Sequence, residues 1–462
     1  MLTEYLGWFI LIALVLLYTG AVLLFRSRGW IGKEKALSFF GPCLMIKTQR
    51  GRNALDRTAK KSVRFWNLLG DAGILLALAS MVVMVGLLLW EAVIVLSIPA
   101  SAAPQPTEAL ALPGINPFIP IGYGLLALIL GVVLHELAHG VLARANDVKV
   151  KSLGVLWLVV PIGAFVEQDE EEMMKAPARK RDRIAAAGVM ANFVIALVCM
   201  LALSAVITTS VHPKADGVAI LAVIPGTPAD NASMAAGDII TVVNGTSTPN
   251  VVDLSQALTG AHPGQVVNVT WYSQAKNGLT YAPIQLGAAS SFESGLGANG
   301  TKRAFLGVEE NIVPPQALAS LLQNPFGSAS SQAGLGGSGL ASTPFLFLAL
   351  PFVGLEPIQG NTANLFTVSG PLSVLSTGGV WILVNILFWM VWMNVLLGLS
   401  NALPAVPLDG GFLLRDALTK VVHTLRSSWS QAQLESAVNR LAIATTLLVF
   451  FLILWQFVAP RL

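Results

Sequence analysis

Charged residues are scarce in this sequence of 462 residues: 11% are Asp, Glu, Lys or Arg, against about a quarter in soluble domains. Together with a hydrophobic share of 54%, this scarcity excludes an ordinary soluble enzyme. Cysteine is also scarce, since only Cys43 and Cys199 are present, so neither a disulfide framework nor a cysteine-based zinc site can form. A metal site would need histidine and carboxylate ligands. The formal net charge of +3 gives no reason to expect nucleic acid as a partner.

Long apolar runs predict a chain that crosses a membrane several times. A membrane-spanning helix needs roughly 20 mostly apolar residues. Six runs are predicted to be transmembrane helices: about Tyr5 to Phe25, Leu68 to Ile98, Pro120 to Ala143, Ile184 to Val211, Leu375 to Leu399 and Leu441 to Val458. The first is interpreted as a retained helix, because no basic region precedes it and no small-residue cleavage pattern follows it. Buried helices of a soluble protein would explain neither these lengths nor the charge pattern between them.

Lys and Arg are concentrated in two of the connecting segments, which predicts the orientation of the helices. Residues 26–64 hold eleven of them and residues 144–183 hold eight, whereas residues 212–374 hold four and carry eight acids. The first two segments are therefore expected in the cytosol, and residues 212–374 outside it. Both termini are then expected outside.

A polar insert after the fourth helix has the pattern of a small β-rich domain. Strands are expected at Val218–Ile224, Asp238–Val243, Val266–Tyr272 and Thr280–Leu286, with a helix at Val252–Leu258 and a tight turn at Asn244-Gly245. The run from Pro228 to Gly245 resembles PDZ domains of membrane-associated proteases, which bind chain ends or extended segments at a sheet edge. The plainer alternative is any small β domain. Sequons, which are weak evidence for glycosylation, occur at Asn231, Asn244, Asn268 and Asn299.

The third predicted helix contains His135-Glu136-Leu137-Ala138-His139. At positions i and i+4 the two imidazoles share one helix face and can reach one zinc ion, with Glu136 beside the metal-bound water. Ionisable residues at membrane depth are costly, so three together require compensation by metal or water. The structural alternative is a polar cluster that holds helices together.

Two histidines leave a catalytic zinc one protein ligand short. Asp409, which follows the fifth helix at the same depth and precedes Gly410 and Gly411, is the candidate for the third. The alternative for Asp409 is an N-cap of the next helix.

These motifs resemble those of site-2 proteases, the zinc enzymes that cut substrates within the membrane. The resemblance rests on His135-Glu136-x-x-His139, on Asn401-x-x-Pro404 followed by Leu408-Asp409-Gly410, and on Gly188-x-x-x-Asn192, and it covers about residues 120–440. It implies that His135, His139 and Asp409 bind zinc and that Glu136 is the acid/base residue. It also implies that Asn401 lies near the scissile bond, where it holds the substrate or the oxyanion.

The resemblance also implies a way of holding the substrate. Val155–Val166 is similar to the family's re-entrant β hairpin, whose free edge could pair with an unwound substrate, and Phe165 is expected to be one of the edge donors. The alternative is a loop that packs on the helices.

The expected partners are membrane-spanning protein substrates, lipid, and peptide segments or chain ends at the PDZ-like domain, with no nucleic acid.

The expected fold is an α-helical polytopic membrane protein with about six transmembrane helices and an inserted extracytosolic PDZ-like domain. The expected parts are a first helix with a basic cytosolic loop (1–66), a second helix with an external linker (67–119), catalytic core helices with a cytosolic β hairpin (120–211), the PDZ-like domain (212–290), a Gly- and Ser-rich interfacial or re-entrant segment (291–374) and the last two transmembrane helices (375–462).

The predicted function is zinc-dependent intramembrane endopeptidase activity in regulated intramembrane proteolysis. Zinc would activate water, and Glu136 would serve as general base. The expected location is a prokaryotic cell membrane. The main alternative is a catalytically silent membrane binding protein of the same fold. A metal transporter is a further alternative, although the sequence lacks the internal repeat typical of many transporters.

Overall fold

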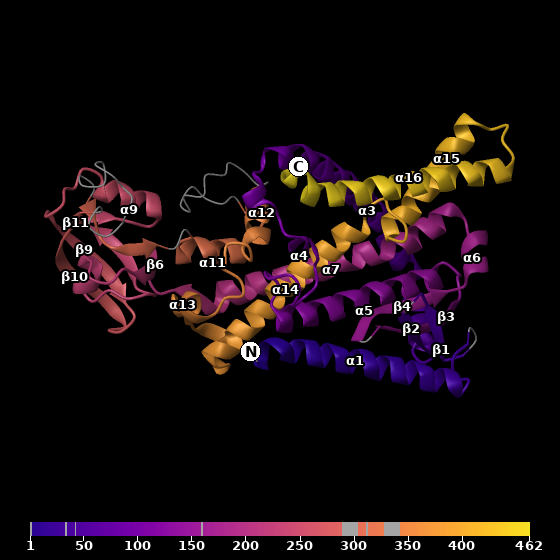
Figure 1. Ribbon diagram of the computed structural model, residues 1–462, viewed down its shortest axis with the longest axis horizontal. Coiled ribbons are helices and arrows are strands. Elements are labelled where there is room, and N and C mark those ends of the chain that lie inside the picture. The colour runs from indigo at the N-terminus through magenta and orange to yellow at the C-terminus, as the bar shows by residue number, and fades with distance from the viewer. Residues whose placement is uncertain are drawn as a thin grey trace. The chain divides into compact units, whose positions relative to one another are not determined.

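The computed structural model describes residues 2–32, 35–41, 43–158, 160–288, 304–310, 313–327 and 342–462. The chain divides into two compact units, residues 1–197 with 390–462 and residues 198–389. The boundary falls within two long helices, α7 (Ala178–Ser210) and α14 (Thr377–Asn401) (Figure 1).

Five helices of the described chain are long and apolar enough to cross a membrane: α3 (Val63–Ile94), α5 (Ile121–Ala145), α7, α14 and α16 (Gln431–Val458). They confirm a polytopic membrane protein. The first span of the sequence prediction falls in α1 (Leu2–Ser27), of which Val15–Ser27 is a shorter apolar helix. The count of six spans therefore stays a prediction. Leu68, Leu75 and Val82 of α3 are each at least 70% exposed, as expected for side chains that face lipid.

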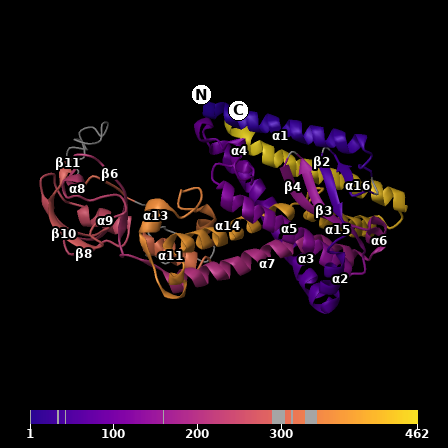
Figure 2. The ribbon, with the colours of Figure 1, turned by 90° about the horizontal axis from the view of Figure 1, so that it is seen from below.

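The first unit also contains a four-stranded antiparallel sheet in the order β1 (Leu37–Phe40), β2 (Cys43–Thr48), β3 (Val150–Leu158) and β4 (Val160–Gln168). β3 and β4 form the predicted hairpin, and β4 lies along α5 (Figure 2). The basic loop after α1 adds β1 and β2 to this hairpin and continues into α2 (Arg52–Lys61), which packs on α5. Local sequence patterns do not predict this pairing, because it joins strands about 100 residues apart.

The other elements of the first unit are η1 (Val95–Ser97), η2 (Ala100–Ala102), α4 (Pro106–Ala109), α6 (Glu170–Lys175), α15 (Asp409–Leu425) and η6 (Ala459–Arg461). The Asp169 side chain caps α6 by accepting a hydrogen bond from the Glu172 amide at 3.1 Å. Bidentate hydrogen bonds of 2.9 and 3.0 Å from Arg181 to Asp416 join the start of α7 to α15.

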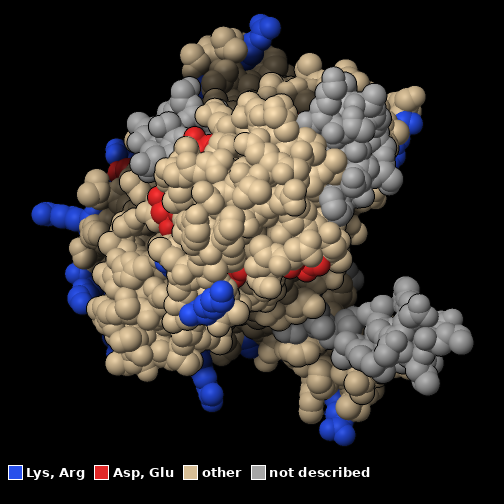
Figure 3. All heavy atoms as spheres, turned by 90° about the vertical axis from the view of Figure 1, so that its left-hand side faces the viewer, with Lys and Arg blue, Asp and Glu red and all other residues tan. Residues whose placement is uncertain are grey.

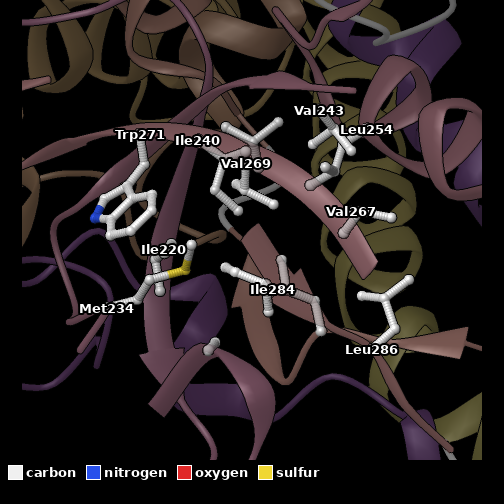
Figure 4. Close-up of a cluster of buried hydrophobic side chains, with 13 residues drawn as sticks. Ile220, Met234, Ile240, Val243, Leu254, Val267, Val269, Trp271, Ile284 and Leu286 are labelled. Carbon is white, nitrogen blue, oxygen red and sulfur yellow. The ribbon is translucent and has the colours of Figure 1, made fainter. Parts of the chain in front are cut away.

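The second unit is built around a sheet in the order β10 (Gly278–Gln285), β9 (Val266–Ser273), β7 (Ile239–Val243), β6 (Val218–Val223) and β13 (Val308–Glu310), with β8 (Thr246–Ser247) paired to β7. The Asn244-Gly245 turn joins β7 to β8 with positive φ at both residues, which explains its composition. α9 (Val251–Leu258) packs near β7 and β8. Figure 4 shows the core, in which Trp271, Ile240 and Val269 are at most 2% exposed.

The other described elements of the second unit are β5 (Val211–Pro213), α8 (Pro228–Asn231), β11 (Gly287–Ala288), β12 (Ala304–Phe305), α11 (Pro315–Gln323), α12 (Ser342–Ala349), α13 (Gly360–Asn364), β14 (Phe366–Val368) and η5 (Gly370–Val374). The face turned to the viewer in Figure 3 carries few charged groups. Much of the predicted Gly- and Ser-rich segment, and the sequon at Asn299, lie outside the described residues.

Candidate metal centre and active site

His135, His139 and Asp409 form a group with the geometry of a metal site. The histidines lie one turn apart on α5, and Asp409 is the first residue of α15. The Nε2 atoms of the two histidines are 3.2 Å apart. Oδ2 of Asp409 lies 3.4 Å from Nε2 of His135, and Oδ1 of Asp409 lies 3.3 Å from Nε2 of His139. All three residues are at most 9% exposed. One ligand atom from each lies within 4.8 Å of the others, so the three can hold one metal ion.

The chemistry of these donors fits zinc. Two imidazole nitrogens and one carboxylate oxygen are a frequent ligand set of catalytic zinc, with the fourth position left open. Among the described residues, the buried Oδ2 atom of Asp409 has no hydrogen-bond donor, which a bound cation would compensate. The sequence analysis named these three residues as candidate metal ligands, and the structure places their ligand atoms close to one another.

Contacts with α7 orient both imidazole rings. Nδ1 of His139 donates to the Ile184 carbonyl at 2.7 Å, which leaves the Nε2 lone pair free for a metal. The Asn192 amide group lies 3.1 Å from Nδ1 of His135 and is completely buried. When Nε2 binds a metal, Nδ1 carries the proton, so its partner would be Oδ1 of Asn192 after rotation of the amide. In the part of the chain that the structure describes, that oxygen otherwise has no hydrogen-bond partner.

Glycines allow the backbone to approach this site closely. A Cβ atom at Gly188 of α7 would overlap both imidazole rings. Cβ atoms at Gly410 and Gly411 would collide with the backbone between Ala402 and Val406, which turns tightly before α15. The spacing Gly188-x-x-x-Asn192 in the sequence therefore has a physical explanation: the glycine makes room for the rings, and the asparagine, one turn later, contacts one of them.

Glu136 lies beside the metal ligands and next to the sheet. Its Oε2 accepts a hydrogen bond from the Val166 amide of β4 at 3.1 Å. Together with His139 and Asp409 it lines a cavity of about 590 Å³, here called the Glu136 cavity. Gln168 of β4 and Glu435 of α16 also line this cavity. A carboxylate placed here can exchange protons with a molecule in the cavity.

The backbone donors of β4 differ from the sequence prediction. In an antiparallel ladder, residues alternately direct their backbone groups toward and away from the partner strand. Val166, paired with Leu153, donates outward to Glu136, so Ala164 also directs its N–H outward. Phe165, the expected edge donor, directs its amide toward β3 and is therefore the wrong residue.

Asn401, the last residue of α14, is half-buried, and its amide donates to the Leu397 carbonyl of its own helix at 2.9 Å. It is not among the residues that line the Glu136 cavity. Its expected place beside the scissile bond stays a prediction.

Comparison with known proteins now identifies the family. The model of peptidase family M50 matches residues 123–449, which contain all the motifs discussed above. The chain belongs to peptidase family M50. This confirms the predicted resemblance to site-2 proteases.

Two relatives illustrate this membership. An uncharacterized protein of Methanocaldococcus jannaschii is 25% identical over 444 residues, which cover 94% of this chain and 93% of the relative. Zinc metalloprotease RasP of Shouchella clausii is 24% identical over 307 residues, 63% of this chain and 65% of RasP. This M50 peptidase is thus an integral membrane metalloprotease with zinc as its cofactor, and the candidate metal site lies in the first unit.

Proposed function

We propose that this M50 peptidase is an endopeptidase that cuts within transmembrane segments of membrane-anchored proteins, as a step of regulated intramembrane proteolysis. The observation that carries the proposal is the buried group of His135, His139 and Asp409 on α5 and α15 of the first unit, with Glu136 beside it. Bound zinc would supply a Lewis acid that polarises a peptide carbonyl and lowers the pKa of water.

In this proposal Glu136 moves the protons of the reaction. It accepts a proton from the attacking water and delivers it to the leaving amine. The hydrogen bond from the Val166 amide keeps its side chain aimed into the cavity. Asn401 would stabilise the substrate or the oxyanion by a hydrogen bond. To do so, its side-chain amide must give up the hydrogen bond that it donates to the Leu397 carbonyl.

The substrate is proposed to pair with the free edge of β4. A helical segment must unwind before its peptide bonds can be attacked, and unwound backbone in a membrane needs hydrogen-bond partners. The outward-facing amide of Ala164 offers such a partner, two residues before Val166, whose own amide donates to Glu136.

The β-rich domain is proposed to be a PDZ-like, extracytosolic module that binds peptide segments or chain ends. Its edge strand β13 borders a cavity of about 370 Å³, here called the β13 groove, which is also lined by Leu254, Leu258 and His262. The Ile224 amide donates to the Gly307 carbonyl, so the next residue, Val308, directs its backbone groups away from β6. An extended peptide can add to such an edge.

The proposed location is a prokaryotic cell membrane.

The decisive experiment compares the purified full-length protein with Glu136→Gln on a single-span substrate in liposomes, with bound zinc quantified. Loss of the general base is expected to reduce cleavage roughly 10²–10⁴-fold while zinc stays bound. Glu435→Gln, at another carboxylate of the Glu136 cavity, is the control and should retain cleavage.

The alternative is a catalytically silent membrane binding protein. It is not favoured, because all four residues of the predicted site are present and relatives are named as zinc metalloproteases. Zinc binding without cleavage in both the wild-type protein and Glu136→Gln would support it. Metal flux into sealed vesicles would instead support a transporter.

A further inference from the structure

Helix α2 is amphipathic, and its exposed face is basic. Leu55 and Ala59 are buried, one turn apart, whereas Arg57, Lys60 and Lys61 are exposed. Exposed cations also flank the helix. The α2 cation cluster is defined here as Arg50, Arg57, Lys60, Lys61 and Arg64.

The α2 cation cluster has no acidic partners. Among the described residues, none of its five members lies within 4.0 Å of a carboxylate oxygen, whereas most other cations on this side do. Asp56, the acid on α2 itself, pairs with Arg144, and Asp71 on α3 pairs with Arg179 and Arg183. The nearby acids are therefore already committed to other cations, and the cluster keeps its full positive charge for an external ligand.

The cluster lies where the membrane surface is expected. α3 begins at Val63, two residues after α2 ends, and its exposed apolar side chains start at once, with Phe65 53% and Leu68 70% exposed. The Trp66 indole donates to the Thr58 carbonyl of α2 at 2.9 Å. Aromatic residues next to exposed apolar ones mark the boundary between hydrocarbon and headgroups. The cations of α2 are thus at headgroup depth.

We propose that the α2 cation cluster binds the anionic headgroups of phospholipids in the adjacent leaflet. Positive residues near helix ends are common, and they orient membrane proteins. This cluster differs because its members have no carboxylate partner among the described residues, and because three of them lie on a helix that is packed against α5. Polybasic segments next to a membrane span attract anionic lipid, and each Lys or Arg adds to the attraction.

The site has a direct structural connection to the metal centre. Leu55 of α2 packs against Gly140, since a Cβ atom added at Gly140 would lie 2.9 Å from Cδ1 of Leu55. Gly140 directly follows His139. The Asp56–Arg144 ion pair joins the same two helices. Bound headgroups would therefore hold α2 against the end of α5 that carries the zinc ligands.

The test is lipid retention by the full-length protein in detergent micelles, measured by native mass spectrometry with phosphatidylglycerol and phosphatidylcholine of the same acyl chains. The wild-type protein should prefer phosphatidylglycerol. R57Q/K60Q/K61Q should lose this preference by at least about tenfold, whereas the charge-preserving R57K/K60R/K61R should keep it. Unchanged zinc content verifies that each variant is folded.

Three results would overturn the proposal. These are equal retention of both lipids by the wild-type protein, an unchanged preference in the triple glutamine variant, and loss of phosphatidylglycerol to an excess of inorganic phosphate. The last result would identify a site for soluble phosphate. If the triple glutamine variant does not fold, equal retention of both lipids by the wild-type protein still overturns the proposal.

Discussion

The sheet of the first unit and the larger sheet of the second unit both expose an edge strand beside a cavity. β4 contributes to the Glu136 cavity, and β13 contributes to the β13 groove. Each strand directs backbone amides outward, so each can bind an extended chain. Among the described residues, however, the only group of three metal-ligating side chains lies at the first cavity. We therefore propose that holding an extended peptide and cutting it are separable properties, and that cutting requires a carboxylate and metal ligands beside the edge.

The largest effect is expected at the metal site itself. Asp409→Ala removes one of the three proposed ligands and should lower zinc affinity by more than about 100-fold, beyond the range for outer-sphere partners. Zinc content measured against a competing chelator tests this. Glu435→Gln serves as the control. If Asp409→Ala bound zinc as tightly as the wild-type protein, Asp409 would not be a zinc ligand.

Asn192 is expected to act as a positioning residue for His135. Asn192→Leu keeps the volume but removes the acceptor for Nδ1–H, and should weaken zinc binding roughly 10–100-fold. Asn192→Asp restores an acceptor and should recover most of the affinity. The same chelator competition measures both variants. Equal affinity in the leucine variant would mean that Asn192 only fills space between the helices.

The free edge of β4 is expected to contribute to substrate binding. Ala164→Pro removes an outward donor without breaking the ladder with β3, and should reduce cleavage roughly tenfold, which is the value of one hydrogen bond. Ala164→Gly keeps the amide and is the control. Turnover of a single-span substrate, with zinc quantified in parallel, distinguishes this effect from loss of metal. Full activity of the proline variant would exclude pairing at this edge.

The same change on β13 is expected to have a different result. Val308→Pro should lower the affinity for a fluorescent hexapeptide ending in valine by up to about tenfold, measured by fluorescence anisotropy, with Val308→Ala as the control. Cleavage of a single-span substrate without an external domain should not change. If cleavage fell as it does in Ala164→Pro, the two edges would not be separable.

The smallest effect concerns the anchoring of β4. Burial alone would raise the pKa of Glu167, but hydrogen bonds from Ser152 and Lys47 outweigh it and hold the pKa below its usual 4.5. The ion pair with Lys47 of β2, at 3.1 Å, therefore stabilises the sheet above about pH 4.5, and this contribution is lost as the pH falls through the lowered value.

Glu167→Gln should accordingly lower stability by less than about 1 kcal/mol at neutral pH. The difference in Tm between the wild-type protein and the variant should shrink on acidification. A difference that grew toward low pH would contradict this assignment of Glu167.

The sequence predicted the parts of this protein that depend on local patterns. The apolar runs predicted the five long helices, the Asn244-Gly245 pair predicted a turn, and the spacing of His135 and His139 predicted a shared helix face. Each of these follows from residues close together in the chain.

The features that sequence reasoning missed depend on distant pairing. The basic loop after α1 becomes β1, β2 and α2, because its strands pair with a hairpin about 100 residues later. The direction of the Phe165 amide depends on the register with β3, which periodicity cannot give. The contact of Asn192 with His135 requires the packing of α7 on α5, although the motif Gly188-x-x-x-Asn192 was a signal for it.

The position of the cleaved bond tests the central claim most directly. A single-span substrate in liposomes would be incubated with the full-length protein, and the masses of both products would locate the cut. Cleavage inside the apolar segment, absent in Glu136→Gln, is the result that intramembrane proteolysis predicts. A cut in the polar flanks of the substrate, or the same products from Glu136→Gln, would contradict it.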